Sequence, residues 1–231
     1  MEQFLLETDQ VRCYAPDGSE ITCRGSGQDA EKEKTAPLLS HGRFQEKGRV
    51  IRDRATGAVW TKDANPADFP LSWSEAAEFT AEMRHRRAHG YERWHLPTRR
   101  LLFSLISHQQ KNPCLPEGHP FEDVFPGYYW TSETCRRLPD QAWYGHMGGG
   151  RIHRGMKHGS YMVWPVSLPN ETSPHRDTRK QGRFTVDGGA VHDTWTGRTW
   201  LRDADIAGGL LSWSEALSTV RELNRDRSDG A

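Results

Sequence analysis

Leu71-Ser72-Trp73-Ser74-Glu75-Ala76 is the stretch that decides the fold of this chain, because it occurs a second time at residues 211–216. The two stretches lie 140 positions apart, and at that offset residues 42–91 and 182–231 agree at 20 of 50 positions without a gap. Solenoid repeats have periods of roughly 20–50 residues, so this much longer period is typical of tandem domains. We therefore predict one complete domain over residues 42–168 and the opening of a second copy over 182–231.

The repeated motif has the features of a helix start. Ser72, followed three residues later by Glu75, predicts a capping box in which each side chain accepts a backbone N–H of the other residue. Apolar or small side chains then recur at helical spacing, at Trp73, Ala76, Ala77, Thr80 and Met83, and in the second copy at Trp213, Ala216, Leu217, Val220 and Leu223. This spacing predicts a helix to about Arg87 with one buried face. The motif is interpreted as a packing surface rather than a signature of activity.

Short strands and a second helix are predicted around this helix. Arg49–Asp53 and Ala58–Thr61 flank a glycine turn and predict a hairpin, and Thr98 predicts the cap of a helix from Arg99 to about Ser107. A proline-rich loop over 112–128 follows. Strand-like runs come next, at Tyr128–Ser132, Gln141–Met147, Arg151–His153 and Tyr161–Val166. Two helices followed by an antiparallel sheet indicate an α+β domain.

The composition favours a core made of a few large aromatic side chains. Only 35% of the 231 residues are hydrophobic, yet nine are tryptophan, and we expect Trp60, Trp73, Trp94, Trp130 and Trp164 to pack inside. The formal net charge is zero, which gives no general attraction to nucleic acid or to an acidic membrane. No stretch reaches the roughly 18 apolar residues of a membrane span.

The ends of the predicted domains are marked by linkers. Residues 1–41 are predicted to form a small hairpin and a charged linker, and residues 169–181 a second linker. The turn signal Asp17-Gly18 centres the hairpin. No signal peptide is visible at the N-terminus, so either an export signal has been removed from this sequence or the protein stays inside the cell.

Four cysteines form two pairs that are local in sequence, Cys13 with Cys23 and Cys114 with Cys135. None lies in a CxxC motif, which argues against a zinc ribbon or a thioredoxin-type site. Our preferred interpretation is two disulfides in an exported protein, and free thiols in a cytosolic protein are the alternative.

The order of several short motifs resembles one bacterial family. The motifs are Thr56-Gly57-Ala58-Val59-Trp60, Ser72 to Ala76, Trp94 to Thr98, Tyr129 to Ser132, Ala142-Trp143-Tyr144 and Val163 to Val166. Together they are similar to the family named for the C-terminal domain of the collagen-like adhesin Lcl. The resemblance implies a C-type-lectin-like fold, shared in outline with sulfatase-modifying-factor domains, in proteins that are mostly exported. The best-known member is an adhesin that recognises sulfated glycans.

The chain departs from the family pattern at charged positions. Arg93 and His95 flank Trp94 where the family usually has Asp-Trp-Arg-Leu-Pro, Arg100 replaces a usual Glu, and Ser167 replaces a common Arg. A ligand function that depends on those charges in other members is therefore not expected to be shared by this chain on the resemblance alone.

Two groups of residues are candidates for binding a ligand. The first is a basic stretch that contains a single acidic residue, Glu92, and consists of Arg84, Arg86, Arg87, Arg93, Arg99, Arg100 and Lys111. Arginine binds sulfate and carboxylate in bidentate fashion, so the stretch suits a polyanion, although a solvated helix end is the alternative. The second group is Tyr128, Trp143 and Tyr144, which we expect to reach a surface where sugar rings can stack.

Other chemistry has little support. The calcium-lectin signatures are missing, and Leu138-Pro139-Asp140 is interpreted as a turn. His146, His153 and His158 have no diagnostic zinc spacing and are interpreted as solvated or hydrogen-bonded. We therefore predict no metal site and no cofactor.

These observations predict a non-enzymatic, lectin-like binding module that is secreted, periplasmic or on the cell surface. Its partner is expected to be an anionic glycan or a protein surface. Two alternatives remain open: an enzyme of the formylglycine-generating type that uses Cys114 and Cys135, and a purely structural accessory domain.

Overall fold

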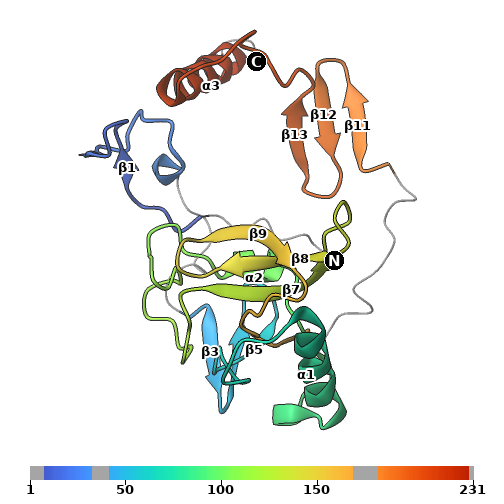
Figure 1. Cartoon of the computed structure of the whole chain (residues 1–231). Coiled ribbons are helices and arrows are strands. Elements are labelled where there is room, and N and C mark those ends of the chain that lie inside the picture. The colour runs from blue at the N-terminus through green and yellow to red at the C-terminus, as the bar shows by residue number, and fades with distance from the viewer. Residues whose placement is uncertain (1–7, 33–41, 169–181, 229–231) are drawn as a thin grey trace. The chain divides into compact units, whose positions relative to one another are not determined.

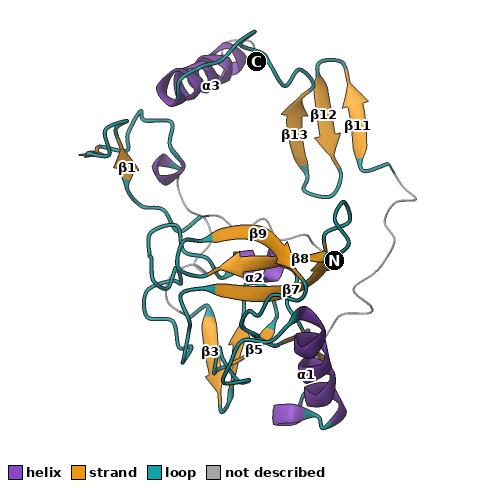
Figure 2. Cartoon of the chain, in the orientation of Figure 1, coloured by secondary structure: helices purple, strands orange, loops and turns teal. Residues whose placement is uncertain are grey.

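The computed structural model describes residues 8–32, 42–168 and 182–228 (Figure 1). The chain divides into two compact units, of which the larger contains Ala36–Thr172 and the smaller contains the N-terminal hairpin and Ser173–Ala231. Both contain helices and small antiparallel sheets, so the predicted α+β class is confirmed (Figure 2). The linker predicted over 169–181 lies outside the described residues, as do residues 33–41 of the first linker.

In the first sheet of the larger unit, the last strand of the unit lies between two earlier strands. Its strands are β3 (Phe44–Lys47), β4 (Val50–Asp53), β5 (Val59–Thr61), β6 (Trp94–His95) and β10 (Val166–Ser167). The order is β3-β4-β5-β10-β6, so β10 lies between two strands that come much earlier in the chain. The predicted strand over Tyr161–Val166 is wrong in extent. Met162 pairs with Tyr129 of the second sheet while Val166 pairs with Trp60, because this segment crosses from one sheet to the other.

The second sheet is a meander of β7 (Tyr128–Thr134), β8 (Gln141–His146) and β9 (Arg151–Met156), which confirms three of the predicted strands. Helix α2 (Arg99–Ser104) begins at the predicted cap, where Thr98 Oγ1 accepts the N–H of Leu101, and packs on one face of this sheet. The helix approaches so closely that a Cβ atom at Gly145 of β8 would lie 2.5 Å from Leu102 Cδ2. A side chain at that position would force Leu102 to move.

Helix α1 (Trp73–His85) begins at the repeated motif. The predicted capping box is present: Glu75 N–H donates to Ser72 Oγ, and Ser72 N–H donates to a Glu75 carboxylate oxygen. Two indoles then join this start to β7, because Trp73 Nε1 donates to Thr131 O and Trp130 Nε1 donates to Leu71 O, both at 2.8 Å. The motif therefore fixes the helix to the second sheet.

Tryptophan side chains fill the core as expected. Trp60, Trp94, Trp130 and Trp164 are fully buried, and Trp73 is partly buried. The Trp164 ring is in contact with three other rings, at centroid distances of 5.4 Å to Trp60, 4.9 Å to Phe121 and 5.5 Å to Tyr129.

A buried ion pair explains part of the sequence shared by the two copies. Arg43 donates from Nε and Nη2 to both oxygens of Asp53, at 2.9 and 2.8 Å, and from Nη2 to Ser104 O at the end of α2. Asp53 also accepts the N–H of Ala55 and the hydroxyl of Thr56. The pair is satisfied on all sides, which a buried charge requires.

The smaller unit contains the N-terminal hairpin. Strands β1 (Cys13–Tyr14) and β2 (Glu20–Ile21) pair around the predicted turn, and the predicted disulfide between Cys13 and Cys23 is present. A short 3-10 helix, η1 (Asp29–Glu31), follows within the predicted linker.

Residues 182–228 form β11 (Phe184–Asp187), β12 (Ala190–Asp193), β13 (Arg198–Leu201) and α3 (Trp213–Ser228). These elements follow the order of β3, β4, β5 and α1. The hairpin registers match as well, since Phe184 pairs with Asp193 as Phe44 pairs with Asp53. Arg183 forms the same two-bond pair with Asp193, at 2.9 and 2.7 Å.

The paired copies allow a matched test of the indole bonds. Trp73→Phe removes the donor to Thr131 O but keeps a ring, so we expect the free energy of unfolding of the larger unit to fall by about 1–2 kcal/mol. Trp213→Phe changes the equivalent residue, which is 52% exposed, and should have almost no effect. Urea denaturation followed by fluorescence measures both. Equal losses in the two variants would contradict this role of Trp73.

Candidate functional site

One face of the second sheet gathers aromatic side chains from three segments. Strand pleating places alternate residues on the same face, and the register pairs Tyr128 with His146 and Tyr144 with His153. Tyr161 lies across these residues, between β9 and β10 in sequence. We call Tyr128, Tyr144, Tyr161, His146 and Arg151 the tyrosine face.

The three tyrosine rings of this face are in mutual contact. Ring centroids are 4.8 Å apart for Tyr128 and Tyr144, 5.3 Å for Tyr128 and Tyr161, and 4.9 Å for Tyr144 and Tyr161. Tyr128 is 42% exposed and the other two are partly exposed. Burial raises the pKa of Tyr144 and of Tyr161, so both phenols stay protonated at neutral pH and keep an O–H donor. The cluster combines an apolar platform with hydrogen-bonding groups.

A cation lies at the edge of this platform. Arg151 is exposed, pairs in register with His146, and its charge favours the ionised form of Tyr144, although burial of that phenol has the larger effect on its pKa. Sequence reasoning missed Arg151 and Tyr161 as site residues. Side chains alternate between the two faces along β9, and this pattern could have indicated that Arg151 lies on the same face as Tyr144. No sequence pattern places Tyr161 on this sheet.

Trp143 does not belong to the tyrosine face. It follows Ala142 and precedes Tyr144 on β8, so pleating turns it to the face covered by α2. The guanidinium of Arg99 lies over its ring at 4.4 Å, and Arg99 also pairs with Glu133. The structure thus separates Trp143 from the other two predicted aromatic residues and brings it to Arg99.

The predicted basic stretch is spread over several elements, and carboxylates partly neutralise it. Arg84 lies in the last turn of α1, Arg99 and Arg100 begin α2, and Lys111 follows α2 in a loop. Ion pairs in this stretch include Arg86 with Glu82, Arg87 with Glu92 and Arg99 with Glu133. The binding of a polyanion by this stretch stays a prediction.

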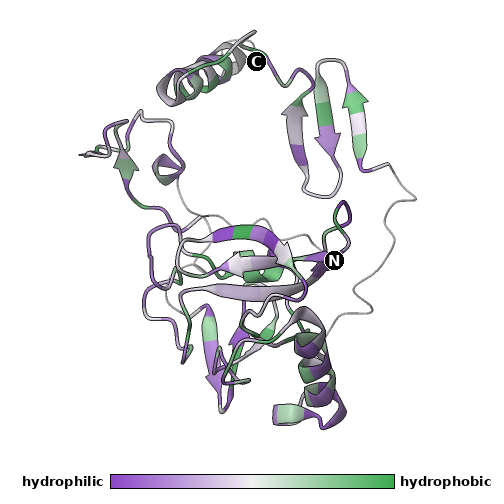
Figure 3. Cartoon of the chain, viewed as in Figure 1, coloured by the Kyte–Doolittle hydropathy of each residue, from purple (hydrophilic) through white to green (hydrophobic). Residues whose placement is uncertain are grey.

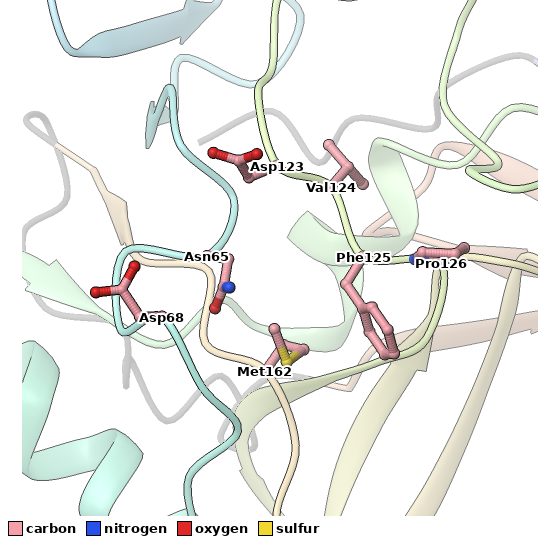
Figure 4. Close-up of a pocket in the computed structure, with 7 residues that line it drawn as sticks. All are labelled: Asn65, Asp68, Asp123, Val124, Phe125, Pro126 and Met162. Carbon is pink, nitrogen blue, oxygen red and sulfur yellow. The ribbon is translucent and has the colours of Figure 1, made fainter.

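The larger unit also contains a pocket of about 480 Å³ (Figure 4). It is lined by Asn65, Asp68, Asp123, Val124, Phe125, Pro126 and Met162. One backbone hydrogen bond connects the pocket to the second sheet, because Met162 N–H donates to Tyr128 O, but none of the lining residues belongs to the tyrosine face. Sequence reasoning missed the pocket because its walls come from three distant segments.

The pocket has an acidic rather than basic character. Figure 4 shows the carboxylates of Asp68 and Asp123 with the amide of Asn65 on one side, and the Phe125 ring with Met162 on the other. Burial, with the carboxylates of Asp123 and Asp68, raises the pKa of nearby Asp63. Among the residues that the structure describes, no group of three or more His, Cys, Asp or Glu side chains is placed to hold a metal ion. The pocket suits hydroxyl or amine groups better than sulfate.

The segment that contains this site matches a known protein family. The family model described as the Lcl C-terminal domain matches residues 49–167, which is more than half of the chain. The chain belongs to the Lcl C-terminal domain family. The family resemblance inferred from the motifs is confirmed, and no curated protein matches the chain. The matched segment of this Lcl C-terminal domain holds every residue of the tyrosine face and of the pocket.

The prediction of a disulfide between Cys114 and Cys135 of the Lcl C-terminal domain is wrong. Both are free and buried. Cys114 N–H donates to Met147 O just after β8, whereas Cys135 N–H donates to Gln141 O at the start of β8. A strand of this length separates the two sites by about 20 Å. A disulfide requires Cα atoms within about 7 Å.

The thiols provide a direct test. Burial raises the pKa of Cys114, so its thiolate fraction at pH 8 is reduced and its alkylation is slow, becoming faster as the pH rises. We expect iodoacetamide to add two groups per chain in urea without reductant, four after reduction, and very little to the native chain. Intact-mass spectrometry counts the adducts. If the chain takes up no label in urea before reduction, Cys114 and Cys135 are joined by a disulfide and the assignment of free thiols is wrong.

Proposed function

We propose that this chain is a non-enzymatic, lectin-like binding module whose tyrosine face binds an anionic glycan. The proposed fold is C-type-lectin-like, as the family resemblance implies. The observation that supports the proposal most directly is the contact of Tyr128, Tyr144 and Tyr161 on a partly exposed face beside Arg151.

The chemistry of the face suits a charged sugar. Aromatic rings give a flat apolar surface for the C–H face of a sugar ring, and protonated phenols donate to its oxygens. The Arg151 guanidinium supplies a bidentate partner for a sulfate or carboxylate. The anionic part of the ligand is therefore proposed to lie on the Arg151 side of the face.

Export is part of the same proposal. The Cys13–Cys23 disulfide favours an oxidising compartment, and a secreted, periplasmic or surface location suits a glycan-binding module. No helix in the described part of the chain is long and apolar enough to cross a membrane.

The enzymatic alternative has less support. A formylglycine-generating mechanism with Cys114 and Cys135 needs the two thiols to act together, and they lie at opposite ends of β8. The purely structural alternative predicts no glycan affinity, so a binding measurement decides between it and the present proposal.

Heparin, a sulfated glycan, serves as the probe. We expect Arg151→Ala and Tyr144→Ala each to weaken binding about tenfold, because a charge-assisted hydrogen bond or a stacking ring contributes roughly 1.5 kcal/mol. Affinity chromatography over a salt gradient and titration calorimetry measure the loss.

Arg154→Ala is the matched control for Arg151→Ala. Arg154 lies on the same strand and carries the same charge, but it pairs with Trp143 and projects on the opposite face. Its loss should have little effect. Equal losses for Arg151→Ala and Arg154→Ala would show nonspecific charge attraction, and the absence of any heparin binding would contradict the proposed function.

A further inference from the structure

Strand β9 forms an open edge of the second sheet. The order is β7-β8-β9, so β8 covers one side of β9, and no described strand pairs with its other side (Figure 1). The opposite edge of the sheet is partly covered, because Met162 N–H donates to Tyr128 O and Trp130 N–H donates to Met162 O. All of β9 pairs with β8 without a bulge, whereas the pairing of β7 is irregular between Trp130 and Thr134. A long, regular, uncovered edge is a template for pairing with another strand.

The register identifies the backbone groups that point out of this edge. Lys157 lies opposite Asp140, one position beyond the last pair of β8 and β9, and its N–H donates to Asp140 O at 2.9 Å. Hydrogen-bonded and non-hydrogen-bonded positions alternate along an antiparallel pair. The outward-pointing groups therefore belong to alternate residues of β9, which are Ile152, Arg154 and Met156. No hydrogen bond joins their N–H groups to a described residue beyond β8.

The side chains of this edge carry charge of one sign. None of residues 141–170 is Asp or Glu, and within that range β9 contributes Arg151 and Arg154. Both arginines are exposed, and neither forms an ion pair with a described residue. Pleating places Arg151 on the tyrosine face and Arg154 on the opposite face, so a cation lies on each side of the edge. Figure 3 shows that β9 is hydrophilic over much of its length.

The charge determines which strand can pair with this edge. Charged side chains on an edge strand normally discourage pairing between chains. On β9 they are all basic, so they oppose a basic strand and favour an acidic one. A second copy of β9 is a poor partner, because antiparallel pairing of two such strands brings basic side chains opposite one another, which is destabilising.

We propose that β9 binds an extended, acidic polypeptide segment by β-strand addition. The backbone of the segment pairs with the outward groups of Ile152, Arg154 and Met156, and its carboxylates lie beside Arg151 on one face and Arg154 on the other. In this mode of binding, backbone hydrogen bonds give affinity and alternate side chains give specificity. The proposal goes beyond the glycan site, because it uses the edge of the sheet and none of the three tyrosine rings, although Arg151 adjoins both.

The probe is a fluorescein-labelled peptide with the sequence Thr-Glu-Glu-Val-Glu-Glu-Val-Thr, which has carboxylates on both faces of a strand. We expect saturable binding to the intact chain. A peptide with lysine in place of each glutamate should bind at least about tenfold more weakly, because like charges repel. A peptide N-methylated at its central valine and glutamate should lose at least about as much, because neighbouring residues direct their N–H groups to opposite edges and both edges are then blocked. Fluorescence anisotropy measures all three peptides.

Two variants separate this site from the glycan site. Arg154→Ala should weaken peptide binding about threefold, which is typical of a solvent-exposed ion pair, and leave heparin binding unchanged. Tyr144→Ala should weaken heparin binding and leave peptide binding unchanged, because its ring lies on the tyrosine face and not at the edge of the sheet. A chain that binds the peptide but not heparin would contradict the glycan function and support the present proposal.

Amide hydrogen exchange followed by NMR locates the bound peptide. Saturating peptide should slow exchange at the outward N–H groups of Ile152, Arg154 and Met156, and leave unchanged the alternate amides of β9 that already bond to β8. The proposal is overturned if the peptide does not bind, if the N-methylated peptide binds equally well, if Arg154→Ala has no effect on peptide binding, or if the slowed amides lie outside β9.

Discussion

The pairing of β10 with β5 and β6 is the contact on which the first domain depends. A strand of two residues from the end of the domain lies between strands that begin more than 70 positions earlier, so it joins the first half of the fold to the second. Trp164, two residues before it, packs against Trp60, Phe121 and Tyr129. The central core is therefore complete only when the whole domain has folded.

The same segment also builds the proposed site. On its way to β10 the chain bridges Leu71 through Tyr161 and Tyr129 through Met162. That path places the Tyr161 ring on Tyr128 and Tyr144 and sets Met162 in the wall of the acidic pocket. Core closure and the proposed binding face are thus consequences of one crossing between the two sheets. A change that displaces this segment is expected to affect stability and binding together.

A comparison of the two copies distinguishes the features that local sequence determines from those that tertiary packing determines. Both form the strand order, the hairpin register, the arginine–aspartate pair and the start of a capped helix, and the reciprocal bond from Ser212 N–H to Glu215 is present as well. Burial differs completely between Trp60 and Trp200. Local sequence is sufficient for the elements, whereas in the first copy their apolar faces form a core with residues 94–168.

The sequence by itself determined the features that arise between near neighbours in the chain. The Ser72–Glu75 capping box, the hairpin that aligns Cys13 with Cys23, the α+β class and the family follow from short motifs, because their interactions span only a few residues. Tertiary structure alone decided that Cys114 and Cys135 lie apart, that Trp143 stacks under Arg99 rather than beside Tyr144, and that Tyr161 and Arg151 complete a surface. Sheet pleating and a crossing between sheets control those positions. Neither leaves a pattern in the local sequence that reveals which distant residues meet.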